Sequence, residues 1–320
     1  MHLLEVKNLR VAFPVKRGPF SRGREELLAV DDVSFAIAPG ETLGLVGESG
    51  CGKTTVARSV IRLQTPTAGS VLFEGEDITR LDGGELRARR RKFQMIFQDP
   101  YGAMNPRMTV GQIIGEAIDA HGIADTPVSR QTRTESLLKA VGLEPAHANR
   151  YPREFSGGQR QRIGIARALA VEPKLIVCDE PVSALDVSVQ AQIVNLLRGL
   201  QRDRALAFLF IAHDLAVVEH ISHRVLVMYL GKIVEAGEAH AVVRAPRHPY
   251  TQALISAVPV VDPDTKRKRI ILSGDVPSPI CPPPGCPFHP RCPLAEARCR
   301  TEAPAVREIV PGHFARCHLA

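Results

Sequence analysis

The most informative segment of this 320-residue chain is Gly47-Glu-Ser-Gly-Cys-Gly-Lys-Thr-Thr55. Its first eight residues fit the pattern G-x-x-x-x-G-K-[ST]. An apolar run, Thr42-Leu-Gly-Leu-Val46, precedes the segment and predicts a buried strand, and residues 54–63 continue it with apolar side chains at helical spacing. Glycines let backbone N–H groups approach phosphate oxygens, and the N-terminus of the helix adds partial positive charge. The segment therefore predicts a phosphate-binding loop (P-loop) in an α/β fold.

The P-loop residues have separate predicted roles. Lys53 is expected to lie along the β- and γ-phosphates of a nucleotide, and the Thr54 hydroxyl to bind Mg²⁺. A Gly-rich turn with a chance lysine is the alternative, and the strand and helix on either side argue against it. The residues expected to contact the nucleotide are Gly47, Glu48, Ser49, Gly50, Cys51, Gly52, Lys53, Thr54 and Thr55.

Two later apolar runs end on polar side chains. Leu175-Ile-Val-Cys178 is apolar throughout, as expected for a parallel strand covered on both faces, and Asp179 and Glu180 follow it. Open α/β sheets place their ligands at such strand ends. The run from Ala205 to Ala212 ends on His213. A plain surface turn for the two carboxylates and a structural role for the histidine are the alternatives.

A second candidate anion site begins at Phe155-Ser-Gly-Gly-Gln159. Ser156-Gly157-Gly158 predicts a turn that starts a basic helix, and helix N-termini bind anions. A capping serine is the alternative, but it leaves Gly157, Gly158 and Gln159 unexplained. Earlier in the chain, Gln98-Asp-Pro100 opens a proline-bounded loop that leads to a helix from about Thr109.

These elements, together with Ser183-Ala-Leu-Asp186, resemble in type and order those of the ATP-binding cassette (ABC) ATPases. The resemblance implies a P-loop NTPase core with an N-terminal antiparallel β subdomain, an inserted helical subdomain and a cysteine-rich C-terminal extension. It implies that Glu180 is the general base, that Asp179 and Gln98 join Thr54 around Mg²⁺, and that His213 contacts the γ-phosphate.

The same resemblance assigns Ser156–Gln159 and Asp186 to an ATP held by the P-loop of a partner, so that two sites form in a head-to-tail dimer. The family usually has leucine where Phe155 stands, a departure that preserves an apolar anchor. Phe13 is the candidate for stacking on adenine, although a Phe in an N-terminal strand is more often part of a core. A basic, Gly-containing loop from Lys16 to Arg24 interrupts these first strands.

Composition narrows the function classes. The start of the chain shows no cationic stretch followed by an apolar core, and no apolar run approaches the roughly 20 residues that span a bilayer. The net charge is +7, yet no nucleic-acid-binding module is recognisable and aromatics make up only 5% of the residues. We therefore expect no nucleic-acid partner. We interpret the basic clusters at Arg87–Lys92 and Lys266–Arg269 as a solvated face beside anionic lipid headgroups.

Residues 1–245 are expected to form the nucleotide-binding domain, with the helical subdomain at about 98–171, and residues 246–320 a C-terminal extension. Five of the seven cysteines lie in this extension, at 281, 286, 292, 299 and 317. The run Gly285–Cys299, which ends at Cys317-His318, resembles the extension of oligopeptide and dipeptide importer ATPases. So do His248-Pro-Tyr-Thr-Gln-Ala-Leu254 and Phe13-Pro-Val-Lys-Arg-Gly18.

By this resemblance Cys286, Cys292, Cys299 and Cys317 are four ligands of a [4Fe–4S] cluster, with Cys281 a spare thiol. Zinc and free thiols are the alternatives, although the gaps are wider than those of paired zinc ligands. A cluster would also supply cross-links to a proline-rich segment with little regular structure. Cys51 and Cys178 are interpreted as small packing residues.

The expected function is that of an ATPase subunit of a bacterial peptide importer, peripheral to the cytoplasmic face of the inner membrane. The expected partners are two transmembrane permeases, a second and paralogous ATPase, and indirectly an extracellular or periplasmic substrate-binding protein. Nickel, glutathione or another small solute remains an alternative cargo. A DNA-repair ATPase would carry a long coiled coil where only about 100 residues lie, and an ABC translation factor would carry two cassettes. An iron or redox sensor would not need the ATP site.

Overall fold

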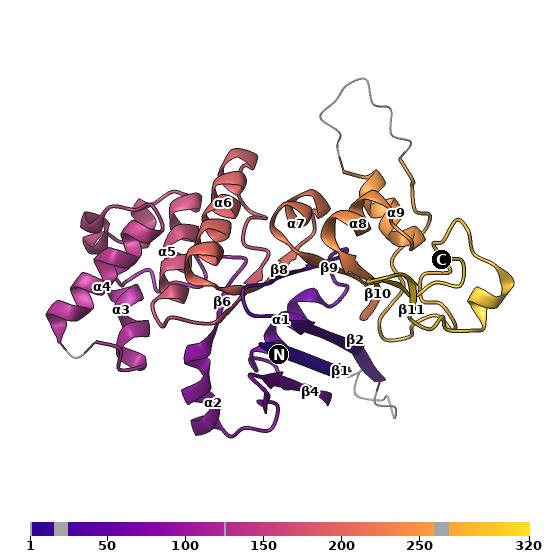
Figure 1. The fold of residues 1–320 in the computed structure, drawn as a ribbon, viewed down its shortest axis with the longest axis horizontal. Helices are drawn as coiled ribbons and strands as arrows, with labels where there is room; N and C mark the ends of the chain where they lie inside the picture. The colour runs from indigo at the N-terminus through magenta and orange to yellow at the C-terminus, as the bar shows by residue number, and fades with distance from the viewer. Residues whose placement is uncertain (1, 16–24, 125, 259–268) are drawn as a thin grey trace. The chain divides into compact units, whose positions relative to one another are not determined.

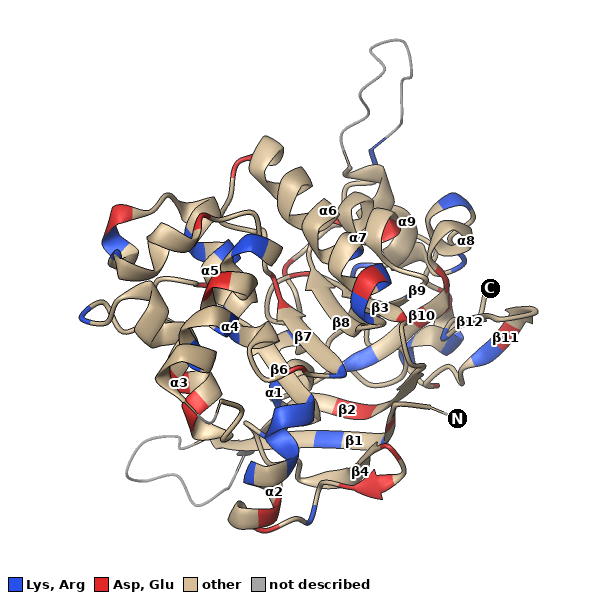
Figure 2. Ribbon diagram, turned by 60° about the vertical axis from the view of Figure 1, so that its left-hand side comes forward, with Lys and Arg blue, Asp and Glu red and all other residues tan. Residues whose placement is uncertain are grey.

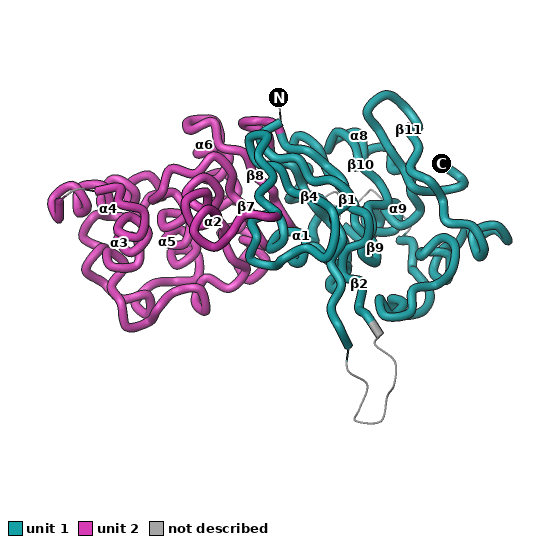
Figure 3. Tube along the Cα trace, turned by 90° about the horizontal axis from the view of Figure 1, so that it is seen from below, with its two compact units in different colours: residues 1–37, 42–79, 212–320 teal, residues 38–41, 80–211 magenta. Residues whose placement is uncertain are grey.

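The computed structural model describes residues 2–15, 25–124, 126–258 and 269–320. The predicted loop from Lys16 to Arg24 lies outside these ranges, as do residues 266–268 of the second basic cluster. Contacts divide the chain into two compact units, coloured in Figure 3. Unit 1 comprises Met1–Ile37, Thr42–Thr79 and Ala212–Ala320, and unit 2 comprises Ala38–Glu41 and Arg80–Ile211.

Unit 1 contains an antiparallel sheet with the strand order β2-β1-β4-β5 (Figure 1). Leu4, Val6 and Val11 of β1 are buried while Lys7 and Arg10 are exposed, because successive side chains of a strand point to opposite faces. The register shifts around Asn8, whose φ of 47° marks an irregularity in the strand. The strands are β1 (Leu4–Val15), β2 (Glu25–Ile37), β4 (Ala68–Phe73) and β5 (Glu76–Asp77).

A second set of strands in unit 1 carries the P-loop. β3 (Thr42–Val46) pairs in parallel with β9 (Arg224–Tyr229), and β10, β12 and β11 continue antiparallel from β9. α7 packs on β3 so closely that a Cβ on Gly44 would lie 2.3 Å from Val218 Cγ1. The remaining elements are α1 (Lys53–Val60), α7 (Leu215–Ile221), β10 (Lys232–Glu238), α8 (Ala239–Arg244), α9 (Pro249–Ser256), η4 (Ala297–Arg300), β11 (Arg307–Val310) and β12 (His313–Ala315).

Unit 2 contains three parallel strands, β6, β7 and β8, paired in that order. Every residue of β7 and β8 is buried, as expected for strands covered on both faces. α3 begins after Thr109, whose side chain caps the helix at the position predicted from the sequence. The elements are α2 (Gly83–Arg89), η1 (Arg90–Lys92), β6 (Phe93–Ile96), α3 (Val110–Ala120), α4 (Pro127–Ala140), η2 (Pro145–Asn149), η3 (Pro152–Glu154), α5 (Gly157–Leu169), β7 (Leu175–Asp179), α6 (Val187–Arg204) and β8 (Ala207–Ala212).

Two surface features relate to the expected membrane location. Lys and Arg residues are concentrated on α2 and the turn after it, at 87 and 89–92 (blue ribbon in Figure 2). Within the described ranges, every helix is too short or too polar to cross a membrane.

Candidate nucleotide site

The P-loop backbone has a shape that only glycine permits at two positions. Gly52 has a φ of 111°, and a Cβ there would lie 2.2 Å from the carbonyl oxygen of Ala29. A Cβ on Gly47 would lie 2.2 Å from the carbonyl oxygen of Met228. Both approaches are far shorter than any van der Waals contact. The loop is therefore packed against the backbone of neighbouring strands and can keep its shape only without side chains at these two positions.

Lys53 is the first residue of α1 and its side chain turns back into the loop. Its Nζ donates hydrogen bonds to the carbonyl oxygens of Gly47 at 2.8 Å and Glu48 at 3.0 Å, and the residue is only 4% exposed. Thr54 and Thr55 follow in the first turn and are half-buried, while Ser49 and Gly50 are exposed. Within the loop, burial raises the pKa of the Cys51 thiol, so Cys51 behaves as a neutral packing residue.

Two further predicted site residues belong to the same unit as the P-loop. His213 follows β8 directly and is exposed. Phe13 lies on β1 opposite Leu27 and is half-buried, so part of its ring is accessible.

In unit 2 the structure brings Gln98 and Glu180 together. Asp179, the last residue of β7, is 3% exposed, and Glu180 follows it. The Glu180 N–H donates to the carbonyl oxygen of Ile211 at 3.0 Å, and its φ of 47° is unusual for a residue with a side chain. The Gln98 amide then donates from Nε2 to Glu180 Oε2 at 2.9 Å. Two residues that are distant in sequence thus present one carboxylate in a defined position.

The Ser156 segment starts α5 with a reciprocal capping box. Ser156 Oγ accepts from the Gln159 N–H at 3.4 Å, and Gln159 Oε1 accepts from the Ser156 N–H at 3.0 Å. Ser156 and Gly157 are exposed, whereas Phe155 is buried and packs edge-on against His147. Asp186, the N-cap of α6, is also exposed. The two helix starts are therefore accessible to an anion or a partner.

The predicted site residues thus fall into two sets, each ordered within its own unit. The chemistry of the three predicted Mg²⁺ ligands fits that ion, because a hydroxyl (Thr54), an amide (Gln98) and a carboxylate (Asp179) are all oxygen donors. Unit 1 holds Phe13, the P-loop and His213, and unit 2 holds Gln98, Ser156–Gln159, Asp179, Glu180 and Asp186.

A P-loop after a parallel strand, an Asp-Glu pair at a strand end and a Ser-Gly-Gly helix start define an ATP-binding cassette, an ATPase. Comparison with known proteins agrees: the family model described as "ABC transporter" matches residues 30–183. A dimeric ATP-binding cassette solved in a post-hydrolysis state with ADP and Pi has a TM-score of 0.65 at 30% identity, over 74% of this chain and 98% of that one.

The model for the oligopeptide/dipeptide transporter C-terminal region matches residues 234–299. A probable peptide ABC transporter ATP-binding protein of Sinorhizobium fredii is 55% identical over 99% of this chain and 90% of its own length. The oligopeptide transport ATP-binding protein AppF of Bacillus subtilis is 53% identical over 99% of this chain and 97% of its own. The chain therefore belongs to the ATP-binding proteins of ABC transporters, in their oligopeptide and dipeptide branch.

The prediction of a [4Fe–4S] cluster is wrong. In the described part of the chain, which includes Cys286, Cys292, Cys299 and Cys317, no group of three or more His, Cys, Asp or Glu side chains is arranged to hold a metal ion. This finding also removes the support for zinc. The names of the relatives carry no iron–sulfur claim either. Burial raises the pKa of Cys286 to about 11 and that of Cys292 as well, which favours neutral thiols. Cys281 is exposed.

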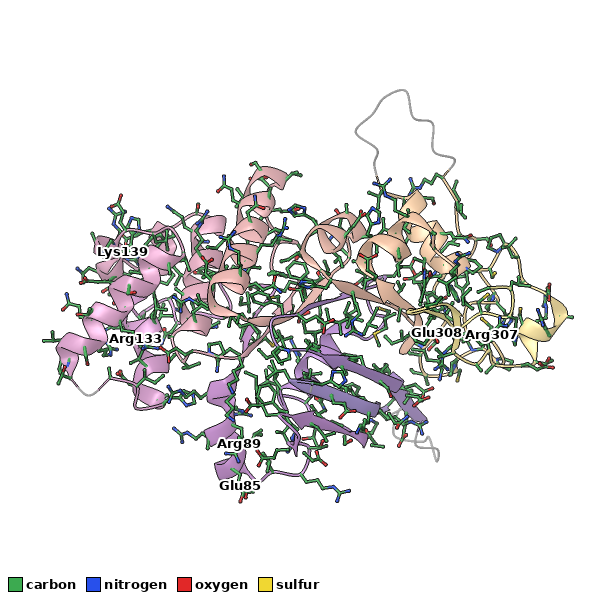
Figure 4. The ribbon with its side chains drawn as sticks, in the orientation of Figure 1. Glu85, Arg89, Arg133, Lys139, Arg307 and Glu308 are labelled. Atoms are coloured by element: carbon green, nitrogen blue, oxygen red, sulfur yellow. The ribbon has the colours of Figure 1, made fainter. Side chains whose placement is uncertain are left out.

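The resemblance implied the cluster, and the need of a proline-rich segment for cross-links supported it. The protein supplies them instead. β12 pairs with β10, and the buried Glu235 accepts hydrogen bonds from His313 Nε2 at 2.7 Å and from the His248 N–H at 2.9 Å. Arg307 of β11, labelled in Figure 4, donates to the carbonyl oxygens of Cys317 at 2.7 Å and Ala320 at 2.9 Å.

The sequence did not reveal the contacts that the C-terminal region makes with the P-loop. Tyr250 and Arg291 both bind Glu48. Tyr250 lies in the His248–Leu254 segment that resembles importer ATPases, but nothing in its local pattern indicates a partner. The one local indication that the P-loop has a basic partner elsewhere in the chain is Glu48, because a carboxylate in a loop that binds a polyanion needs its charge neutralised.

Proposed function

We propose that this ATPase powers the import of di- and oligopeptides through a membrane permease complex. The observation that carries the proposal is the presence in one chain of an ABC transporter match and an oligopeptide/dipeptide C-terminal match. The relatives' names, which include peptide and oligopeptide transport, support the same cargo. The ATPase does not itself contact the cargo, so its permeases and binding protein select the peptide.

The proposed assembly contains two transmembrane permease subunits, a second and paralogous ATPase, and an extracellular or periplasmic substrate-binding protein. The chain would lie on the cytoplasmic face of the bacterial inner membrane as a peripheral subunit. This placement is supported by the family and by the basic surface at α2 and η1, which suits anionic headgroups. Glu180 and the Ser156–Gln159 segment are both intact, so neither half-site is marked as degenerate.

The proposed domain organisation has a nucleotide-binding domain at 1–245 and an extension at 246–320. The β2-β1-β4-β5 sheet would be the antiparallel subdomain of the cassette. Helices α3, α4 and α5 fall within about 98–171, where the helical subdomain is expected.

The proposed hydrolysis places each side chain according to its chemistry. The Lys53 ammonium, which now binds two loop carbonyls, would bind phosphate oxygens instead. Glu180 would accept the proton of the attacking water, with Gln98 holding its carboxylate and His213 contacting the γ-phosphate. Mg²⁺, held by Thr54, Gln98 and Asp179, would neutralise phosphate charge. Phe13 would stack on adenine.

Ser156–Gln159 and Asp186 would contact the ATP bound by the partner ATPase. ATP binding would then close the dimer, and hydrolysis with phosphate release would reopen it. This alternation would be the source of the movement in the permeases.

The test is reconstitution with the permeases, second ATPase and binding protein encoded by neighbouring genes. We expect ATP-dependent uptake of a labelled oligopeptide into proteoliposomes. Glu180→Gln should keep ATP binding and reduce turnover at least about a hundredfold, because only the general base is lost. Glu85→Gln, a change in an exposed carboxylate on α2 (Figure 4), is the control and should turn over normally. Uptake of nickel or glutathione without peptide uptake would contradict the proposed cargo.

A further inference from the structure

Glu48, the second residue of the P-loop, is bound on three sides. Its carbonyl oxygen accepts from Lys53 Nζ at 3.0 Å, and its N–H donates to the Tyr250 hydroxyl at 2.8 Å. Its carboxylate receives both terminal nitrogens of Arg291, Nη1 at 2.7 Å and Nη2 at 3.1 Å. Tyr250 and Arg291 both come from the C-terminal region. One residue of the phosphate loop is therefore positioned mainly by residues about 200 or more positions away in the sequence.

Arg291 is held rigidly enough to position its partner. Its side chain is 8% exposed, and its guanidinium carbon lies 6.0 Å from the centre of the Tyr229 ring. Tyr229, Tyr250 and Phe288 pack on one another with ring centroids 4.7 to 5.5 Å apart, and all three are essentially buried. The Arg291 N–H donates to the Phe288 carbonyl oxygen at 3.0 Å. Two parallel hydrogen bonds from a fixed guanidinium specify both the distance and the orientation of the Glu48 carboxylate relative to Arg291.

The ion pair also has an electrostatic consequence. Glu48 places a negative charge on a loop whose ligand is a polyphosphate, and like charges at short range oppose binding. Arg291 neutralises that charge where the Glu48 side chain is 29% exposed, and partial burial limits screening by solvent. Without Arg291 the carboxylate would be unpaired and free to swing toward the phosphates.

We infer that Arg291 is a positioning residue for ATP binding. Through its hydrogen bonds to Glu48 it sets the shape of the P-loop, and it neutralises the charge of Glu48, the only acidic residue of Gly47–Thr55. The C-terminal extension is then part of the ATP site rather than an appendage. This inference rests on the proposed role of the P-loop as the phosphate site.

The test is ATP affinity of the full-length chain, measured by calorimetry in a Glu180→Gln background so that ATP is not consumed. Arg291→Ala should bind ATP at least about fivefold more weakly, the effect of losing part of a charge-assisted pair. Adding Glu48→Gln to Arg291→Ala should restore part of the affinity, because the unpaired charge is removed while the two hydrogen bonds from the guanidinium remain lost. Arg298→Ala is the matched control, since the Arg298 side chain donates to Glu296 and to the His318 carbonyl oxygen within the extension, and it should bind ATP normally.

Several results would overturn the inference. ATP affinity of Arg291→Ala within about twofold of the parent would do so, as would failure of Glu48→Gln to restore any part of the lost affinity. If Arg291→Ala does not fold, Arg291→Lys decides: it keeps the charge but loses the pair of parallel hydrogen bonds, and should weaken ATP binding, whereas unchanged affinity contradicts the inference. In the assembled transporter, Arg291→Ala should raise KM for ATP and leave kcat nearly unchanged.

Lys53→Ala in the same titration distinguishes a failure of the proposed phosphate-binding role of the P-loop from a failure of the inference about Arg291. Normal ATP affinity in Lys53→Ala would remove the proposed role of the P-loop itself. Loss of binding in Lys53→Ala with normal binding in Arg291→Ala would remove only the inference about Arg291.

Discussion

The side-chain amide of Gln98 donates a hydrogen bond of 2.9 Å to the carboxylate of Glu180, a residue 82 positions later in the chain. Glu180 follows a strand that is buried along its whole length, and its backbone takes a φ of 47°. A residue with a Cβ adopts that conformation only when its surroundings hold it there. The carboxylate proposed as general base is therefore constrained from both its backbone and its side chain.

This constraint predicts that Gln98→Ala lowers kcat of the assembled transporter by about tenfold or more, because a base that moves loses its alignment with the attacking water. ATP affinity should change less than kcat. Gln94→Ala is the control: Gln94 is on β6, and its side-chain amide donates to the Arg90 carbonyl oxygen. Equal kcat values for the two variants in a steady-state ATPase assay would contradict the role given to Gln98.

The exposed capping box at Ser156 predicts that the isolated chain is a weak ATPase, since this segment completes the site of a partner. Ser156→Ala should reduce turnover of the assembled transporter far more than Thr109→Ala. Both serve as N-caps with the same reciprocal pattern, so the two changes cost similar local stability, about 1 kcal/mol. Full turnover by a preparation that sedimentation shows to be monomeric would exclude a composite site.

The backbone of the P-loop predicts unequal effects of two glycine substitutions. Gly52→Ala should lower the free energy of unfolding by at least about 3 kcal/mol, because the new methyl would meet the Ala29 carbonyl in addition to a strained φ. Gly50→Ala, with a φ of 78° and open space around the position, should cost only about 1 kcal/mol. Chemical denaturation without nucleotide measures the free energy of unfolding of both variants. Equal losses in the two variants would show that the Ala29 carbonyl does not pack closely against Gly52.

Burial lowers the pKa of His248 from 6.5 to about 4, and this predicts a pH-dependent stability. The unfolded chain binds a proton below pH 6.5 that the folded chain does not bind until about pH 4. The contribution of neutral His248 to the free energy of unfolding is thus complete above pH 6.5 and is lost as the pH falls toward 4. The loss between pH 7 and pH 5 is about 2 kcal/mol.

His248→Asn tests this expectation. Asparagine cannot titrate, but it can still accept the Tyr250 N–H that His248 Nδ1 now accepts at 3.1 Å. The variant should be less stable at pH 7, yet lose less stability between pH 7 and pH 5 than the parent chain. An unchanged pH dependence of the free energy of unfolding would show that other groups cause it.

The cassette could be predicted because its signals are local. The strand, loop and helix around Lys53 follow from apolar periodicity and glycine placement within about 20 residues, and the start of a helix at about Thr109 follows from the proline-bounded loop before it. α9 illustrates the usual limit: residues 247–258 have an amphipathic pattern that predicts one helix, whereas α9 spans Pro249–Ser256. Its N-terminus is set by His248, which caps the helix, and by Pro249 at the first helical position. Local chemistry thus placed the elements and left their ends uncertain by a few residues.

The C-terminal extension depended on contacts that no local pattern encodes. The resemblance of the cysteine-rich segment to an importer extension implied a metal cluster, but the chain holds this segment through the β10–β12 pairing and the buried Glu235–His313 pair. Arg291 reaches Glu48 across 243 positions of sequence. Backbone propensity acts over a few residues, whereas the choice of partner for a buried charge is made when distant segments pack together. The sequence alone therefore identified an ATPase and its motifs, and only the tertiary structure joined its last 70 or so residues to the phosphate loop.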